Sequence, residues 1–251
     1  MSLRTPRSVW LHVYVVFSDM RLAVPRRVLS LLLGVAVCLG FAVADAAELR
    51  RAKLFVLGSS TAAGVGASSP SKSWTALLNA HLIESRQSSL TNWAVPGALT
   101  ASAMCRDTAQ ASAASRQWQA ANWAIQAGAT HLLLAFPSND AVAGVSANDI
   151  LSQVSSIQQC AQAMNVKVAV LSTLPRAGLQ SAQKKVIHTV AIELRKKMGP
   201  CYIDVYTQLA EPRGSEPARE LSAGDGIHYN DAGHQVIFGA VRNFLDSGAC
   251  F

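Results

Sequence analysis

Short apolar runs alternate with longer helical patterns along most of this chain, and that alternation is typical of an α/β fold with a mainly parallel sheet. Five runs are interpreted as strands: Lys53–Leu57, Leu90–Val95, His131–Phe136, Lys167–Ser172 and Cys201–Val205. Five segments are interpreted as helices: Trp74–Ser85, Ser112–Ala127, Asn148–Met164, Ser181–Met198 and Ala232–Asp246. Gly128 and Asn165 stand where helix C-caps are expected. We predict one domain without an internal repeat.

The first 46 residues have the pattern of a signal peptide. The positively charged head holds Arg21, Arg26 and Arg27. An apolar run, 28–44, follows and ends in the small-residue pattern Ala44-Asp45-Ala46, a cleavage signal. The stretch 1–19 is an extra N-terminal extension, and Met20 is a candidate start. An uncleaved anchor is the alternative, because the run is almost long enough to span a bilayer. The A-x-A site favours cleavage, so we expect an exported domain at 47–251 with no membrane span.

The small net charge of the chain outside the leader argues against a nucleic-acid-binding surface. The formal net charge is +7, but residues 1–46 hold five Arg and two Asp, which leaves 17 basic and 13 acidic residues and a net charge of +4. Two basic clusters, Lys184-Lys185 and Arg195-Lys196-Lys197, lie on one predicted helix. They are interpreted as a solvated helix face and a last helical turn, not as a binding patch.

Four cysteines remain outside the leader: Cys105, Cys160, Cys201 and Cys250. An even number in an exported chain indicates up to two disulfides, and three pairings are open. We favour Cys105–Cys160 with Cys201–Cys250; the second would tie the end of the chain to the last strand. No C-x-x-C spacing is present, so no zinc site is predicted.

A late segment, Asp225-Gly-Ile-His228, has the residue types of an acid–base relay. A carboxylate can hold one imidazole nitrogen while the other accepts a proton from a nucleophile. Ser60 is the candidate nucleophile, because Gly58-Ser59-Ser60 breaks the first predicted strand at its carboxyl end, where α/β sheets bind ligands. The irregular stretch 207–224 delivers Asp225 and His228 and is expected to be functional.

Two further strand ends can supply donors for an oxyanion. Gly97 ends the segment 92–97 and offers a backbone N–H in a turn that a side chain would crowd. Asn139 brings an amide side chain out of the third strand, in Pro137-Ser138-Asn139-Asp140. All three strand ends and the late loop are expected to meet at one site.

These four segments resemble, in order and type, the four blocks of the SGNH hydrolases, also called GDSL esterases and lipases. The resemblance spans Gly58 to His228 and implies a flavodoxin-like three-layer α/β/α sandwich with a five-stranded parallel sheet. It implies Ser60 as nucleophile, His228 as base and Asp225 as its partner. The backbone N–H groups of Ser60 and Gly97, with the Asn139 side chain, are implied as the oxyanion hole. No cofactor or metal is implied.

The chain departs from the family pattern at two positions. Ser59 stands in place of the usual Asp, which puts the fine geometry of the loop in doubt, and Pro137 stands in place of a Gly. The expected reaction is hydrolysis of a carboxylic ester, with a small-molecule or polysaccharide ester as substrate. Exported members often remove acetyl groups from polysaccharides. A lysophospholipase or thioesterase role, and a catalytically silent glycan- or protein-binding module, are the alternatives. The oligomeric state is left open.

Other residues are given structural interpretations. The glycines of 58–66 lack the Lys of a P-loop and the spacing of a dinucleotide motif, so nucleotide binding is rejected. Trp74, Trp118 and Trp123 are interpreted as packing residues, while Trp93 is left open. His234 is placed on the helix that follows the catalytic turn.

Overall fold

The computed structural model describes residues 51–105, 120–136, 138–212 and 214–251. The predicted leader and residues 112–119 of the predicted second helix lie outside them. The strands are β1 (Lys53–Gly58), β2 (Ser89–Asn92), β3 (His131–Ala135), β4 (Lys167–Leu171) and β5 (Tyr202–Ile203). They form a five-stranded sheet of order β2-β1-β3-β4-β5, in which every neighbouring pair is parallel. This order is that of the flavodoxin-like doubly wound folds, so the predicted fold class is confirmed.

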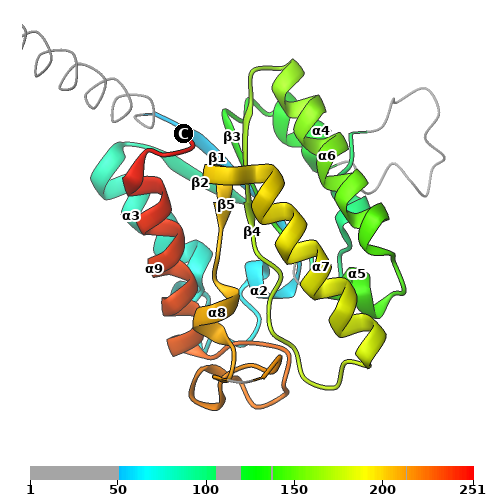
Figure 1. Cartoon of the computed structure of the whole chain (residues 1–251). Helices are drawn as coiled ribbons and strands as arrows, with labels where there is room; N and C mark the ends of the chain where they lie inside the picture. Colours follow the sequence, from blue (N-terminus) through cyan, green and yellow to red (C-terminus); the bar gives the residue numbers. More distant parts are fainter. Residues whose placement is uncertain (1–50, 106–119, 137, 213) are drawn as a thin grey trace, which may run out of the picture. The chain divides into compact units, whose positions relative to one another are not determined.

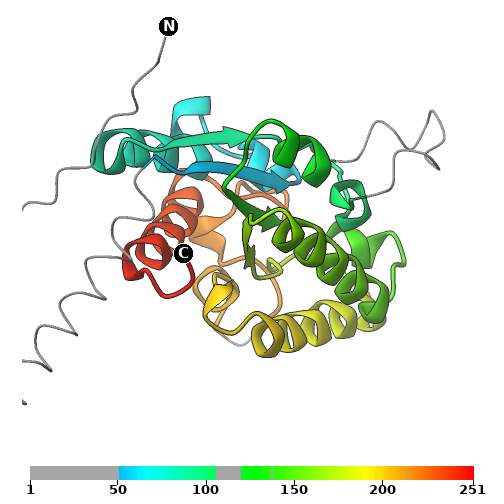
Figure 2. The ribbon, with the colours of Figure 1, turned by 90° about the horizontal axis from the view of Figure 1, so that it is seen from above.

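Helices cover both faces of the sheet (Figures 1 and 2). On one face lie α3 (Trp74–Arg86) and α9 (Asp231–Ser247), and on the other lie α4 (Ala120–Gln126), α6 (Ala147–Ala163) and α7 (Ser181–Met198). The short helices are α2 (Ser60–Ala63), α5 (Asn139–Val142) and α8 (Tyr206–Leu209). Among the described residues, no helix has both the length and the apolar character needed to cross a membrane.

The strand side chains explain why β1 is a continuous apolar run. Leu54 and Val56 belong to the core beneath α3 and α9, whereas Phe55 and Leu57 belong to the core beneath α4, α6 and α7. Because successive side chains point to opposite faces, a strand buried on both faces must be apolar at every position.

The predicted boundaries of the elements differ from the structure mainly at the sheet edges. The second strand was expected to reach Val95, and β2 ends at Asn92, although Trp93 and Val95 still donate backbone hydrogen bonds to β1. The last strand is shorter than the expected Cys201–Val205. Gly128 and Asn165 have positive φ angles of 85° and 56°, as residues just beyond a helix end commonly do.

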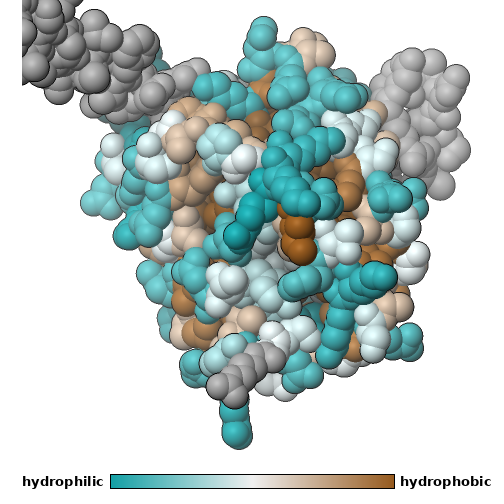
Figure 3. Space-filling view, in the orientation of Figure 1, coloured by the Kyte–Doolittle hydropathy of each residue, from teal (hydrophilic) through white to brown (hydrophobic). Residues whose placement is uncertain are grey.

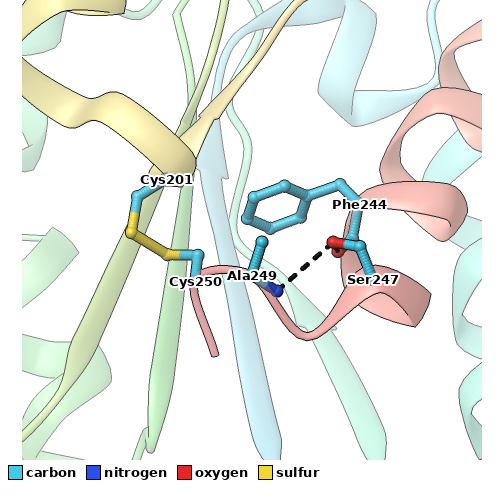
Figure 4. Close-up of a disulfide and its surroundings, with 5 residues drawn as sticks. All are labelled: Cys201, Phe244, Ser247, Ala249 and Cys250. Atoms are coloured by element: carbon cyan, nitrogen blue, oxygen red, sulfur yellow. Dashed lines mark hydrogen bonds between the residues drawn. A yellow bond between two sulfur atoms is a disulfide. The ribbon is translucent and has the colours of Figure 1, made fainter.

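Both favoured disulfides are present, Cys105–Cys160 and Cys201–Cys250. The second ties the segment after α9 to the residue before β5 (Figure 4). Beside it the buried ring of Phe251 packs edge-on against Phe244 and His131, with ring centroids 5.5 and 4.5 Å away. The chain after α9 is thus held both covalently and by apolar burial.

Candidate active site

The chain turns at once from β1 into α2, which places two serines at the carboxyl end of the central strands (Figure 1). Gly58 is required by close packing, because a Cβ there would lie 2.5 Å from the backbone oxygen of Ala135. Ser59 is fully buried, and among the described residues its Oγ has no hydrogen-bond partner. Ser60, the first residue of α2, is partly exposed. Of the two serines, Ser60 is therefore the one whose hydroxyl a ligand can reach.

The loop before α9 carries a hydrogen-bonded Asp–His pair. Asp225 Oδ2 lies 2.6 Å from His228 Nδ1, and Oδ1 accepts the backbone N–H groups of Ile227 and His228, both at 2.8 Å. Burial acts to raise the pKa of Asp225, but these hydrogen bonds outweigh it and lower the pKa to about 2. An ionised carboxylate only accepts hydrogen bonds, so Nδ1 carries the proton and Nε2 is left free to accept one. The imidazole has the tautomer of a general base.

The segment after α2 packs directly against the loop of His228. Gly66 has a φ of +98°, and a Cβ there would lie 2.2 Å from the Tyr229 oxygen and 3.1 Å from His228 Cβ. No hydrogen bond joins Ser60 Oγ to the His228 ring within the described part of the chain. Catalytic hydrogen bonds are often long before substrate binds. The fold therefore brings the two segments together without a direct hydrogen bond between the Ser60 hydroxyl and the His228 ring.

His234, on the first turns of α9, ties three segments together. Its ring is fully buried; Nδ1 accepts the backbone N–H of Trp74 at 3.3 Å, and Nε2 donates to the Val65 oxygen at 3.2 Å. Burial, above all, lowers its pKa. The neutral ring thus positions the segment that follows Ser60. The sequence analysis placed His234 on this helix correctly but gave it no part in the site.

Gly97 lies in a turn beyond β2, and its φ of +81° explains why the residue is glycine. The expectation that a side chain would crowd this turn is wrong, because a Cβ there meets nothing within 4 Å. The constraint is the backbone conformation and not space. Neither Gly97 N–H nor Ser60 N–H donates a hydrogen bond to another described residue, so both stay available to a ligand.

Two adjacent residues at the start of α5 hold the segment that follows Gly97. Asn139 Nδ2 donates to the Ala98 oxygen at 3.2 Å. The buried Asp140 carboxylate accepts the N–H of Thr100 at 3.0 Å and its hydroxyl at 3.1 Å. Burial raises the pKa of Asp140, and the hydrogen bonds from Thr100 only partly oppose this. The amide of Asn139 keeps a second N–H for a ligand. Pro137 lies outside the described residues.

Arg176 is a site residue that the sequence analysis missed. It lies in the loop after β4, and its Nη1 donates to Asn139 Oδ1 at 3.2 Å. With Nδ2 bonded to Ala98, both ends of the Asn139 amide are fixed. The same loop contacts the His228 segment, since Ala177 N–H donates to the Gly226 oxygen at 2.8 Å. The position of Arg176 just past a strand end was the available signal.

Two clefts of contrasting chemistry adjoin these segments. The first, of about 290 Å³, is lined almost entirely by apolar side chains, among them Trp93, Val95, Trp123 and Phe136 beside Gly58. Trp123 is 43% exposed, so its interpretation as a packing residue is wrong, whereas Trp74 is fully buried as predicted. Trp118 lies outside the described residues. Trp93 both packs on Phe55 and lines the cleft.

The second cleft, of about 370 Å³, lies beside Asp225. Its lining includes Asp225, Ile227, Arg176, Gln180 and Gln183. The apolar cleft thus includes Gly58, two residues before Ser60, and the polar cleft includes Asp225 of the Asp–His pair.

A model of the GDSL-like lipase/acylhydrolase family matches residues 56–236. Among curated proteins, none matches the chain. Solved structures that do match include TesA, with 18% identity, a TM-score of 0.60 and coverage of 78% of this chain and 99% of that one.

The esterase EstA from Pseudoalteromonas sp., inhibited by monoethylphosphonate, matches with 14% identity and a TM-score of 0.58, covering 77% of this chain and 98% of that one. A two-domain esterase active on acetylated mannans matches with 16% identity and a TM-score of 0.57. There the match covers 85% of this chain and 54% of that one. At such identities these structures establish a shared fold.

Proposed function

The chain belongs to the GDSL-like lipase/acylhydrolase family and is a carboxylic ester hydrolase, and we propose that Ser60, His228 and Asp225 are its catalytic triad. The observation that carries this proposal is the Asp225–His228 pair, joined at 2.6 Å and packed against the segment that follows Ser60. Its ionised carboxylate orients the imidazole, and the imidazole activates a hydroxyl that is otherwise a poor nucleophile.

In the proposed reaction Ser60 Oγ attacks the ester carbonyl while His228 Nε2 takes its proton. The oxyanion receives hydrogen bonds from the N–H groups of Ser60 and Gly97 and from the Asn139 amide. Collapse of the tetrahedral intermediate breaks the bond to the alcohol, which leaves with the proton held by His228. Water then attacks the acyl-enzyme by the same route and restores Ser60.

We propose a short acyl group, such as acetyl on a carbohydrate hydroxyl, as the substrate. The polar cleft with Gln180 and Gln183 suits a hydroxylated alcohol, and a fold relative acts on acetylated mannans. The apolar cleft favours a second candidate, the hydrolysis of longer acyl esters or thioesters of lipids. Its volume of about 290 Å³ and its large apolar side chains exceed what a methyl group needs.

The test compares p-nitrophenyl acetate with p-nitrophenyl octanoate. We expect Ser60→Ala to lower kcat/KM by about a thousandfold or more and His228→Ala to do the same, because the triad acts as a unit. Ser59→Ala is the matched control and should keep a measurable fraction, since its buried Oγ bonds to no described residue. The reverse result for the two serines would place the nucleophile at Ser59.

The acyl preference separates the two substrate candidates. Faster turnover of acetate supports deacetylation, whereas a strong preference for octanoate supports the lipid candidate. Absence of turnover, together with absence of labelling by a fluorophosphonate, would instead indicate the silent binding module, because covalent capture requires an activated serine.

We also propose that the protein is exported and that its domain begins near Ala47. The A-x-A signal supports this, and so do the two disulfides, which persist in oxidising compartments. Mass spectrometry of the protein recovered from the periplasm or the medium tests the proposal. A mass that still includes the leader would contradict cleavage.

A further inference from the structure

A third cleft, of about 330 Å³, lies between the first half of α7, the loop after β4 and α8. We call it the basic groove, because four basic residues line it: Arg176, Lys184, Lys185 and His188. The lining contains no Asp or Glu. Of the α7 residues that line the groove, all are partly or fully exposed except Ile187, which is buried at its base, while Val190 belongs to the buried side of the helix. Figure 3 shows hydrophilic residues across this side of the molecule, with a few hydrophobic ones between them.

The basic side chains at the two ends of α7 differ in whether they form ion pairs. Near its end Arg195 pairs with Asp204, and Lys196 pairs with Glu193 at 2.8 Å. No ion pair in the described part of the chain includes a basic side chain of the groove. The interpretation of Lys196 and its neighbours as a solvated last turn therefore holds, whereas Lys184 and Lys185 line a cleft. Cations gathered in a cleft without counter-charges favour an anionic ligand.

The basic groove adjoins the proposed catalytic site through Arg176 and Leu179, which line both the groove and the polar cleft. Arg176 lines the groove, also lines the polar cleft beside Asp225, and donates to Asn139. An ester whose alcohol part enters the polar cleft can extend along the loop after β4 into the groove. Hydroxyl groups of Thr189, Tyr206 and Ser215 line the groove as well, and these suit the hydroxyls of a sugar more than an acyl chain.

We propose that the basic groove binds an anionic polysaccharide, whose carboxylate or phosphate groups are held by Lys184 and Lys185 while an acyl ester on the same chain lies at Ser60. This inference rests on the proposed function and names its substrate class. The groove supplies affinity for the polymer and takes no part in the bond-breaking steps. Binding by such contacts weakens with salt, because exposed charges are screened.

The test uses the double variant Lys184→Glu/Lys185→Glu beside the matched control Lys196→Glu/Lys197→Glu, which makes the same charge change at the other end of α7. The substrates are acetylated polygalacturonate, an acetylated phosphorylated mannan, acetylated neutral mannan and p-nitrophenyl acetate. We expect kcat/KM of the groove variant on the anionic polymers to fall by about tenfold or more, mainly because KM rises. At high salt this loss should be smaller, because exposed charges are screened. Turnover of p-nitrophenyl acetate should be unchanged, and the control should stay within about twofold.

The two anionic polymers distinguish a carboxylate ligand from a phosphate ligand. Equal losses in groove variant and control, or equal turnover of neutral and anionic polymers by the wild type, would overturn the proposal. Lysophosphatidylglycerol micelles are assayed as a further substrate. If the groove variant lost activity on these micelles alone, the ligand of the groove would be a lipid and the proposal would be overturned. Binding of Ser60→Ala to unacetylated polygalacturonate, followed by calorimetry, tests the groove without catalysis. A failure of the groove is thus separable from a failure of the proposed esterase, which the acetate assay reports.

Discussion

Asp225–His228 and Asp231–His234 are two Asp-x-x-His segments with the same spacing, and they differ in backbone, exposure and partners. The first lies in a loop, where the carboxylate reaches both the ring and the backbone N–H of its own histidine. The second lies in the first turns of α9, where Asp231 instead binds Ser68 and Lys72. His234 turns inward and is fully buried. The first pair has the proposed role of proton transfer, whereas the second holds segments of the structure together.

This difference shows that spacing alone does not make a relay. In a loop the carboxylate can fold back over the two following N–H groups and meet the ring. In a helix those N–H groups face along the axis, so the carboxylate at the first turn is directed outward. The same four-residue pattern therefore acquires its chemistry from the backbone that carries it.

The largest effect is expected from Asp225→Asn. An amide can donate to His228 Nδ1 and stabilise the tautomer that has no free acceptor for the Ser60 proton, so kcat/KM should fall by about ten-thousand-fold. Asp231→Asn is the matched control and should change activity by only a few fold. Steady-state kinetics on p-nitrophenyl acetate checks both. A comparable loss in the control would mean that the two pairs share the catalytic task.

His234→Ala should separate stability from catalysis. It removes a buried ring and leaves the Val65 oxygen and the Trp74 N–H without their partner, so the free energy of unfolding should fall by about 2–4 kcal/mol. His228→Ala, at a partly exposed position, should lower it by no more than about 1 kcal/mol while removing activity. Urea unfolding of both variants measures the contrast. Equal stability losses would contradict the assignment of separate roles.

A smaller effect on the free energy of unfolding is expected when the pH is lowered. Burial lowers the pKa of His234 in the folded protein, so below about pH 6.5 the unfolded chain binds more protons there. The stability that the neutral ring contributes is complete above this pH and is lost as the pH falls. In His234→Gln, the free energy of unfolding, measured by urea unfolding at a series of pH values, should depend less on pH in this range. Asp225, whose folded pKa is about 2, loses its contribution in a separate window, between about pH 4 and 2.

The sequence was enough to predict what depends on neighbours along the chain. Short continuous apolar runs and longer helical patterns located the strands and helices, and the Asp225–His228 spacing located a carboxylate beside an imidazole. What it missed depends on residues brought together by the sheet. The Arg176–Asn139 contact joins residues 37 positions apart, and the ring of His234 bonds to Val65, 169 positions away. Trp123 followed a helical pattern whose exposed face no local signal identified.

The Cys201–Cys250 bond encloses a ring of the chain that contains both Asp-x-x-His segments, while Ser60 lies outside both disulfide rings. A closed loop of 49 residues removes about 4 kcal/mol of conformational freedom from the unfolded chain in the entropy model. Thiol reduction would therefore act unevenly on the two parts of the proposed catalytic triad. Ser60, the proposed nucleophile, would keep the close packing around Gly58, whereas the segment that bears the proposed base would lose a covalent restraint.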